Sequence, residues 1–162
     1  MTDSTTALRT EVYSHGVRSA VASIASRIHI AAFRKLGQSG WSEQSVDSLA
    51  AADGAALIAA YEGEQMAGFI LIRSAADEAE LLTIAVDPGF QRAGVASLLI
   101  EAAKQKLEKK SIQSFFLEVR RDNAAAIACY KKLGFEKIAV RKDYYTDDNG
   151  SKTNAEIFRL ML

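Results

Sequence analysis

The segment VDPGFQRAGVA, from Val86 to Ala96, constrains the fold because it joins a strand pattern directly to a helix pattern. The run LLTIAV before it is typical of a buried strand, and the run ASLLIEAAKQKLEKK repeats apolar residues at helical spacing. A second junction of this kind joins SFFLEV to NAAAIACYKKLGF. Strands followed directly by helices indicate parallel pairing in the middle of a sheet, so we expect a mixed α/β fold.

The helix start that follows Pro88 and Gly89 is a candidate anion site. The first amides of a helix have no intrahelical acceptor, and the helix dipole adds positive potential there. Gly94 and Ala96 leave little side-chain bulk over these amides, and Gln91 and Arg92 add donors at the rim. A diphosphate would fit a helix that begins near residue 93. An ordinary turn containing glycine is the alternative, since neither a P-loop nor a dinucleotide fingerprint is present.

Apolar patterns and turn residues predict one domain over residues 1–162, with residues 1–7 flexible. The expected order of elements is β-α-α-β-β-β-α-β-α-β-β. Strands are expected at residues 8–14, 55–61, 66–73, 79–86, 114–119, 136–145 and 155–162, and the last turn at 146–154. Ser42 is a candidate N-cap for the second helix. The predicted apolar faces of the first and third helices are Val17, Val21, Ile24 and Ile28, and Val95, Leu98, Leu99, Ala102 and Leu107.

Composition excludes several classes of protein. Hydrophobic residues make up 49% of the chain and charged residues 25%, as in globular proteins. The start MTDSTT has no apolar core, and no run of ~18 uncharged apolar residues occurs, so neither a signal peptide nor a membrane span is expected. The single cysteine, Cys129, suits a reducing compartment and is expected to be a small core residue. We therefore expect a cytoplasmic protein with no membrane partner.

Charge is unevenly distributed along the chain. Residues 1–81 carry 6 Lys/Arg and 10 Asp/Glu, whereas residues 82–162 carry 14 and 10. This distribution favours the second half as host of an anionic ligand. The excess is too small and scattered to predict a nucleic-acid partner. The turn DDNG lacks the later acidic ligand of a calcium loop, and no metal site is expected.

Three polar residues of the second junction can each be explained without a ligand. Glu118 interrupts an apolar strand, so it either faces solvent at a sheet edge or lines a polar cleft. Asn123 is a candidate N-cap, and Gly134 is a candidate C′ residue of the same helix. With Gly134 at C′, Tyr130 falls at C3, where a side chain packs against the C″ residue Phe135. Helix capping and packing alone would therefore account for Asn123 and Tyr130.

The sequences of these two junctions resemble motifs of the GNAT superfamily of N-acetyltransferases. TIAVDPGFQRAGVASLL resembles the family's motif A, and LEVRRDNAAAIACYKKLGF resembles the motif that follows it. GWS, IAVDP, LEVR and RKDYY look most like the bacterial ribosomal-protein-alanine N-acetyltransferase branch. The resemblance implies a single GNAT-like domain whose mixed, mostly antiparallel sheet is splayed in the middle.

The resemblance also implies a ligand and roles for particular residues. Acetyl-CoA would be the acetyl donor, with no metal. Backbone amides of the motif A loop would hold its pyrophosphate, and the preceding strand would pair with its pantetheine arm. The implied cofactor-binding residues are Gln91, Arg92, Ala93, Gly94, Val95 and Ala96, the strand residues Thr83, Ile84, Ala85 and Val86, and Asn123. Glu118 would be the general base, directly or through water, and Tyr130 the general acid.

The implied chemistry is direct attack of a neutral amine on a thioester. A chain-terminal amine, with a pKa of ~7.7–8.0, is neutral to about a tenth or more at pH 7, whereas a lysine amine at ~10.4 is neutral to less than about one part in a thousand. An α-amine is therefore favoured, in particular the N-terminal alanine of a ribosomal protein. A small-molecule amine acetyltransferase and a non-catalytic acyl-CoA-binding domain are the alternatives.

The walls of the acceptor site also follow from the resemblance. The loop LGQSGWS and the hairpin beginning DYY would enclose it, with Trp41, Tyr144 and Tyr145 bracketing a peptide N-terminus. Exposed turn aromatics or core residues are the alternative interpretation of these three side chains. His15 and His29 lie far from the motifs in sequence and are assigned no role. Both a monomer and a homodimer remain open.

Overall fold

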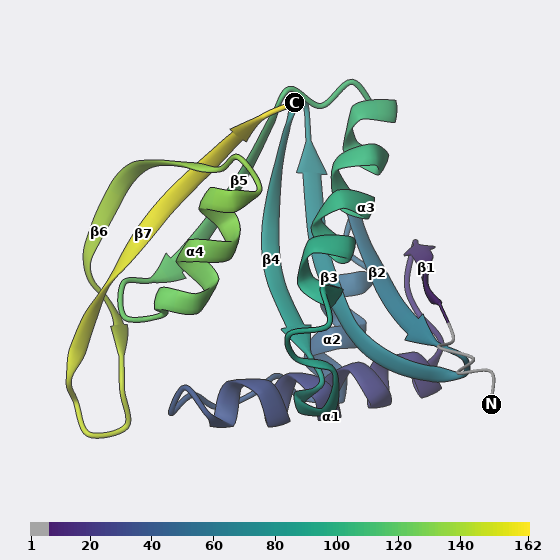
Figure 1. Cartoon of the computed structure of the whole chain (residues 1–162), viewed down its shortest axis with the longest axis horizontal. Coiled ribbons are helices and arrows are strands. Elements are labelled where there is room, and N and C mark those ends of the chain that lie inside the picture. The colour runs from purple at the N-terminus through teal and green to yellow at the C-terminus, as the bar shows by residue number, and fades with distance from the viewer. Residues whose placement is uncertain (1–6) are drawn as a thin grey trace, which may run out of the picture.

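The computed structural model describes residues 7–162, so all but residue 7 of the segment 1–7 expected to be flexible lies outside the described part. Within this described part, seven strands form one sheet in the order β1-β2-β3-β4-β5-β7-β6 (Figure 1). The strands are β1 (Leu8–Ser14), β2 (Ala55–Glu62), β3 (Gln65–Ala75), β4 (Glu78–Val86), β5 (Ser114–Arg120), β6 (Glu136–Thr146) and β7 (Lys152–Met161). The helices are α1 (Ser19–Arg34), α2 (Glu43–Ala50), the 3₁₀ helix η1 (Pro88–Phe90), α3 (Val95–Lys109) and α4 (Ala124–Lys132). The predicted order of strands and α-helices is confirmed.

The sheet is splayed between β4 and β5, as the resemblance implies. These two strands form the parallel pair, and the other neighbours in the sheet are antiparallel. Only Glu78–Glu80 of β4 pair with Ser114–Phe116 of β5, after which the two strands diverge (Figure 1). The later part of β4 is therefore a free strand edge inside the sheet.

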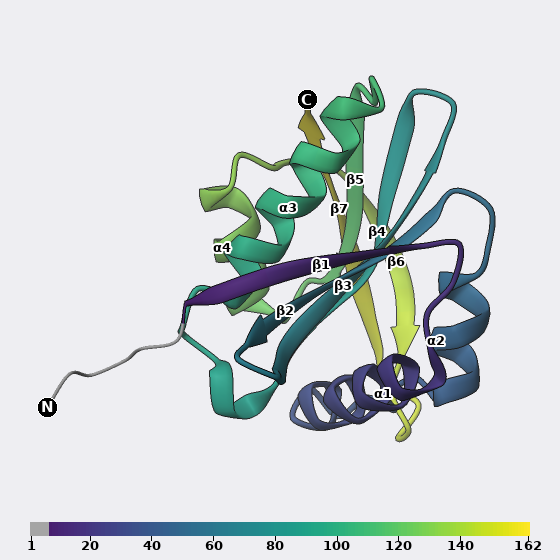
Figure 2. The same cartoon turned by 90° about the vertical axis from the view of Figure 1, so that its right-hand side faces the viewer.

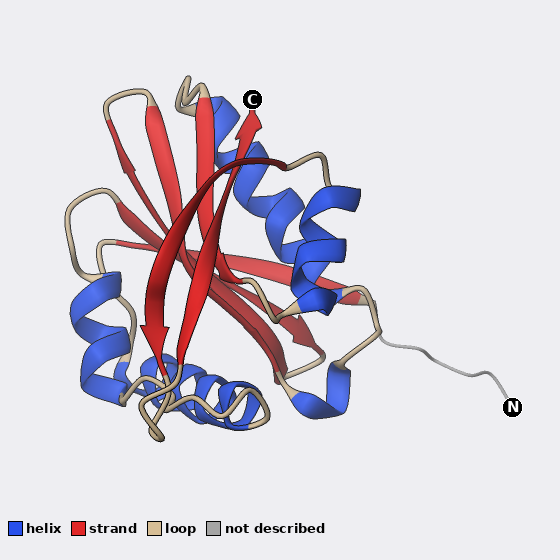
Figure 3. Cartoon of the chain, turned by 90° about the vertical axis from the view of Figure 1, so that its left-hand side faces the viewer, coloured by secondary structure: helices blue, strands red, loops and turns tan. Residues whose placement is uncertain are grey.

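Apolar side chains pack on both faces of the sheet. α3 and α4 cover one face around a core that includes Phe115, Leu117 and Phe158. α1 and α2 cover the other face of β2 to β4 around Leu57, Phe69 and neighbouring residues. Figures 2 and 3 view this arrangement from the edge that β1 forms and from the opposite edge, formed by β6. No helix in the described residues is long and apolar enough to span a membrane.

The buried face of α1 differs from the predicted one. Its fully buried residues are Ala22, Ala25, Ser26, Ile28 and His29, so only Ile28 of the predicted stripe is among them. The small side chains of Ala22 and Ala25 let the helix approach the sheet closely, and the larger Val21 and Ile24 flank this line of contact. The rotation of the helix places His29 in the core.

The buried face of α3 is also rotated from the predicted one. Its fully buried residues are Val95, Leu99, Ile100, Ala103 and Leu107. Ile100 and Ala103 thus take the places predicted for Leu98 and Ala102, which are only partly buried against the same core. The residues that pack on the sheet thus include a row at four-residue spacing, namely Val95, Leu99, Ala103 and Leu107.

The last turn and Cys129 differ from what the sequence predicts. The last turn is shorter than residues 146–154, because Thr146 pairs with Lys152 and Tyr145 with Thr153 in the β6–β7 ladder. Cys129 is partly exposed rather than a core residue, since Tyr130 is the residue that α4 buries fully.

Candidate functional site

The loop between β4 and α3 leaves a helix N-terminus open. Asp87 accepts a hydrogen bond from the Gly89 amide at 2.8 Å and caps η1. Arg92 and Gly94 then adopt positive φ angles of 63° and 79°. α3 therefore begins at Val95, later than predicted, with Gly94 as its N-cap residue.

The first amides of α3 have no protein acceptor within the described residues. No backbone oxygen accepts from the amides of Val95, Ala96 or Ser97, and no side chain caps the helix. By contrast, the side chain of Ser42 caps α2, as predicted. A methyl group at Gly94 would meet no other protein atom within 4 Å, so the position before these amides is uncrowded. The residues present therefore fit a diphosphate-sized anion.

The free edge of β4 begins beside a β-bulge. Thr83 pairs with Leu71 and Leu81 pairs with Ile72, so Leu82 is an extra residue in β4. In the pairing of the described strands, Thr83 to Val86 have partners on β3 and none on β5. Their outward main-chain groups can therefore bind an extended ligand as a neighbouring strand would.

A cleft with a volume of about 860 Å³ opens between the α1–α2 layer and the β5–β7–β6 part of the sheet. Its lining comes from the loop before α2, from α2 and from strands β3 to β7, and includes Trp41, Leu49, Glu80, Leu82, Glu118, Arg141, Tyr144, Tyr145 and Ile157. The structure thus brings together Glu118 and all three aromatic candidates for the acceptor wall.

Glu118 lines this cleft rather than an outer edge of the sheet. Its neighbours Leu117 and Val119 point into the α3–α4 core, so Glu118 points to the opposite face. Its carboxylate oxygen lies 3.1 Å from a guanidinium nitrogen of Arg141 on β6. Arg141 also lies over the ring of Tyr144, 5.4 Å from its centroid. The ion pair holds a half-buried carboxylate at the cleft.

Tyr130 lies on the other face of the sheet, where it is buried in the α3–α4 core. The Phe135 amide donates to the Tyr130 carbonyl at 3.0 Å and the Gly134 amide to the Lys131 carbonyl at 3.1 Å, which is a Schellman motif. The rings of Tyr130 and Phe135 pack edge to face, 5.9 Å apart, so the predicted helix-end packing is confirmed. Burial, with smaller contributions from Cys129 and Tyr145, raises the pKa of the Tyr130 phenol and keeps it protonated.

Asn123 is engaged as a helix cap. Its side-chain oxygen accepts from the Ala126 amide at 3.3 Å, as the N-cap prediction requires. A capping oxygen leaves the amide nitrogen of the same side chain available to a ligand.

Tyr144 and Tyr145 owe their placement to an irregular stretch of β6. Three residues of β6 lie between the pairs Arg141–Ala155 and Tyr145–Thr153, opposite a single residue of β7. Within this bulge Asp143 has a φ of 53°, and its amide donates to the Asn154 side-chain oxygen at 2.9 Å. The bulge directs the exposed Tyr144 and the half-buried Tyr145 toward the cleft.

A cleft with a carboxylate, an open strand edge and a free helix start thus follow one another along β4 and into α3. Comparisons with known proteins associate this arrangement with one family. Residues 24–135 match the Acetyltransferase (GNAT) family. The chain belongs to this family. It is 44% identical over 86 residues to the ribosomal protein bS18 alanine N-acetyltransferase of Escherichia coli K12. That match covers 53% of this chain and 58% of the relative, so it spans little more than half of the relative's length.

Solved structures of the GNAT family share the fold. The crystal structure of the Escherichia coli ribosomal-protein-S18-alanine N-acetyltransferase superposes with a TM-score of 0.81 at 31% identity, covering 94% of both chains. An acetyltransferase from Bacillus anthracis, solved with acetyl coenzyme A, superposes with a TM-score of 0.63 at 26% identity. That match covers 68% of this chain and 64% of the Bacillus chain.

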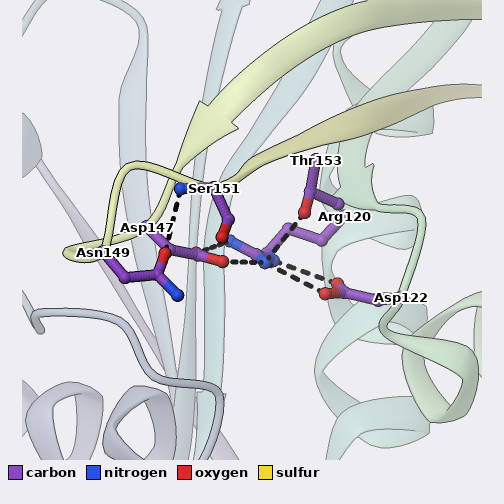
Figure 4. Close-up of polar contacts among 6 residues, drawn as sticks. All are labelled: Arg120, Asp122, Asp147, Asn149, Ser151 and Thr153. Carbon is purple, nitrogen blue, oxygen red and sulfur yellow. Dashed lines mark hydrogen bonds and ion pairs between the residues drawn. The ribbon is translucent and has the colours of Figure 1, made fainter.

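Two residues that contact the candidate site, His29 and Arg120, were given no role on sequence grounds. His29 is buried and hydrogen-bonded to Thr83 and Trp41, which corrects the view that it lies far from the motifs. Arg120 at the end of β5 binds Asp122, Asp147 and Thr153 (Figure 4). An arginine that ends an apolar strand could have signalled a buried ion pair, whereas nothing near His29 in sequence signals its partners.

Arg120 ties three parts of the chain together. It joins the end of β5 to Asp122, just before the Asn123 cap, and to Asp147 in the turn between β6 and β7. Its guanidinium also lies over the ring of Tyr145, 5.4 Å from the centroid. The turn DDNG is thus held by an arginine, and the described residues contain no cluster of side chains suited to a metal ion.

We predict that Arg120→Met lowers the free energy of unfolding by ~2 kcal/mol. The substitution keeps most of the apolar volume but leaves two carboxylates without their partner, and these are partly exposed, so the loss stays below that of a fully buried pair. Urea denaturation measures the change. Arg121→Met, at the exposed neighbouring position, is the control and should change stability by less than ~0.5 kcal/mol. Equal losses in both variants would contradict the importance of this ion-pair cluster.

Proposed function

We propose that the described residues act as one acetyl-CoA-dependent N-acetyltransferase domain. The observation that carries this proposal is the succession of three features along the chain: the cleft is lined by β4 as far as Leu82, the free edge continues to Val86, and the open start of α3 follows at Val95. A diphosphate on the α3 amides would leave a pantetheine arm to follow Thr83 to Val86 toward that cleft. The uncrowded position at Gly94 supports the first contact, and the absence of a β5 partner supports the second.

We further propose that the acceptor is the N-terminal α-amine of a protein, in particular an alanine of a ribosomal protein. The name of the Escherichia coli relative supports this choice, as does the large fraction of neutral α-amine near pH 7. A cleft walled by Trp41, Tyr144 and Tyr145 has room for the first residues of a peptide chain. A small metabolite amine is the competing acceptor.

In this proposal the carboxylate of Glu118 takes the proton from the attacking amine, directly or through water. The new bond forms between the amine nitrogen and the acetyl carbon, while the carbon–sulfur bond breaks. A backbone N–H of residues 83–86 donates to the carbonyl oxygen as negative charge develops there. Tyr130 donates its phenolic proton to the departing thiolate. Arg141 keeps the Glu118 carboxylate oriented along the cleft.

The raised pKa of Tyr130 is compatible with an acid role. A phenol with a pKa of ~10 is already a weaker acid than a thiol at ~8.5, and burial makes proton donation more unfavourable. A thiolate released beside Tyr130 would experience the same desolvation, which raises the pKa of the thiol as well. The two shifts partly cancel, so the position of the phenol matters more than its acidity in water.

The acceptor class can be tested with a peptide library and acetyl-CoA, analysed by mass spectrometry. We expect one acetyl group on the α-amine of peptides that begin with alanine, and none on peptides whose only free amine is a lysine side chain. Matched peptides with a blocked N-terminus are the control. Inert peptides together with turnover of polyamines or amino sugars would identify a small-molecule acetyltransferase instead. Binding of acetyl-CoA without turnover of any amine would indicate a non-catalytic domain.

Tyr130→Phe should lower kcat about 100-fold, because it removes the proton donor and preserves the ring that packs on Phe135. The KM for acetyl-CoA should change by less than about twofold, since the phenol acts on the leaving group. Steady-state kinetics measure both values. Tyr61→Phe removes another buried hydroxyl, one that faces Tyr13 on the outer strands, and should keep full activity. An unchanged kcat in Tyr130→Phe would eliminate the general-acid role.

Gly94→Ala should raise the KM for acetyl-CoA about tenfold. The added methyl group would occupy the uncrowded position before the α3 amides, where we place the pyrophosphate. Gly37→Ala is a matched control, because Gly37 also has a positive φ, 68°, and open surroundings, but lies in the loop after α1. Both variants should lose similar stability, ~1 kcal/mol, from the strained backbone. A tenfold change in both KM values would point to strain rather than to ligand contact.

A further inference from the structure

His29 is a buried histidine to which the mechanism above gives no role. Its side chain is 1% exposed. The imidazole lies between two aromatic rings, stacked on Phe33 with centroids 4.0 Å apart and on Trp41 with centroids 4.8 Å apart. The ring thus fills the space between α1 and the segment that lines the cleft at Trp41.

Both ring nitrogens of His29 are hydrogen-bonded, and the bonds determine the tautomer. The Trp41 amide donates to Nδ1 at 3.0 Å, so Nδ1 must carry the lone pair. Nε2 therefore carries the hydrogen and donates to the hydroxyl of Thr83 at 2.9 Å. Burial lowers the pKa of His29 to about 4, which keeps the ring in this neutral form near pH 7.

At one end of this chain of contacts, α1 fixes the main chain of Trp41 on both sides. Besides the bond to His29, the hydroxyl of Ser26 donates to the Trp41 carbonyl at 2.7 Å. Gly40 approaches α1 so closely that a Cβ there would overlap the backbone of Ile30. The wall of the cleft at Trp41 is therefore attached to α1 rather than free to move as a loop.

At the other end lies the free edge of β4. Thr83 directly follows the extra residue Leu82, at the point where β4 has already separated from β5. The hydroxyl of Thr83 points toward α1, and its main chain belongs to the edge on which we place the pantetheine arm. A single imidazole thus connects the edge proposed for the acetyl donor to the wall proposed for the acceptor.

Building on the proposed function, we propose that His29 is a positioning residue that holds the Trp41 wall and the open edge of β4 in one fixed relation. It touches neither substrate in this role. Its effect is on the distance and angle at which the amine meets the thioester, to which rates are very sensitive. Loss of the link should therefore lower the rate of transfer more than the affinity for coenzyme A, whose pyrophosphate would lie on the α3 amides.

Thr83→Val and Thr83→Ser form a pair that tests the link at its β4 end. Valine keeps the shape of threonine and removes the hydroxyl, whereas serine keeps the hydroxyl and removes a methyl group. We expect kcat/KM for the acceptor to be about three- to tenfold lower in Thr83→Val than in Thr83→Ser, because serine retains the hydroxyl that binds His29. The dissociation constant of coenzyme A should change by less than about threefold in both variants. A packing role would reverse the order of the two variants, and that result would overturn the proposal.

The Trp41 end can be followed without any substrate, because Trp41 is the single tryptophan of the chain. His29→Phe keeps a ring for stacking and removes both hydrogen bonds. We expect acrylamide to quench Trp41 fluorescence at least about twofold more efficiently in this variant, with a smaller increase in Thr83→Val and none in Thr83→Ser. Circular dichroism shows that each variant is folded at the assay temperature. If His29→Phe does not fold, the Thr83 pair still decides.

These measurements separate this inference from the proposed function. A wild-type chain that acetylates no amine would refute the proposed function, and the quenching experiment would still test the link between His29 and Trp41. Quenching equal to wild type in both His29→Phe and Thr83→Val would refute the link. Wild-type kinetics in Thr83→Val, with an active wild-type enzyme, would refute the positioning role.

Discussion

Two parallel strands that pair over three residues and then separate determine how the rest of this protein is arranged. Because β4 and β5 are parallel, the chain must cross over between them, and α3 makes that crossing. The start of α3 therefore lies near the end of β4, beside the free strand edge. An open edge inside a sheet carries main-chain donors and acceptors without partners, which favours an extended polar ligand in the gap.

The gap also joins the two faces of the sheet. The α3–α4 face holds the open helix start and the buried phenol of Tyr130, and the opposite face holds the cleft and the carboxylate of Glu118. If acetyl-CoA enters from one face and the amine from the other, the two substrates meet without crossing a protein layer. Such an arrangement suits direct transfer, because no covalent enzyme intermediate is needed to carry the acetyl group between sites.

Most of the local structure could be predicted from the sequence, and most of the long-range contacts could not. The order of elements, the caps at Ser42 and Asn123 and the contact of Tyr130 with Phe135 follow from spacing and helix-end chemistry. The bond from His29 to Thr83 spans 54 residues, and that from Arg120 to Asp147 spans 27. No local pattern encodes such pairs, because they depend on how α1 and the last hairpin dock. The roles of Glu118 and Tyr130 came from family resemblance and remain predictions.

The extra residue in β4 also has a consequence for how such strands can change in evolution. The extra residue is Leu82. On its N-terminal side the odd-numbered Ala79 and Leu81 face the α3 layer, whereas on its C-terminal side the even-numbered Ile84 and Val86 face that layer. The two halves of the strand are thus out of phase by one residue. Removal of Leu82 would close the bulge and would leave the other apolar side chains of β4 in their layers. Deletion of one residue would therefore change which main-chain groups face the open edge, although the remaining apolar side chains would keep their layers.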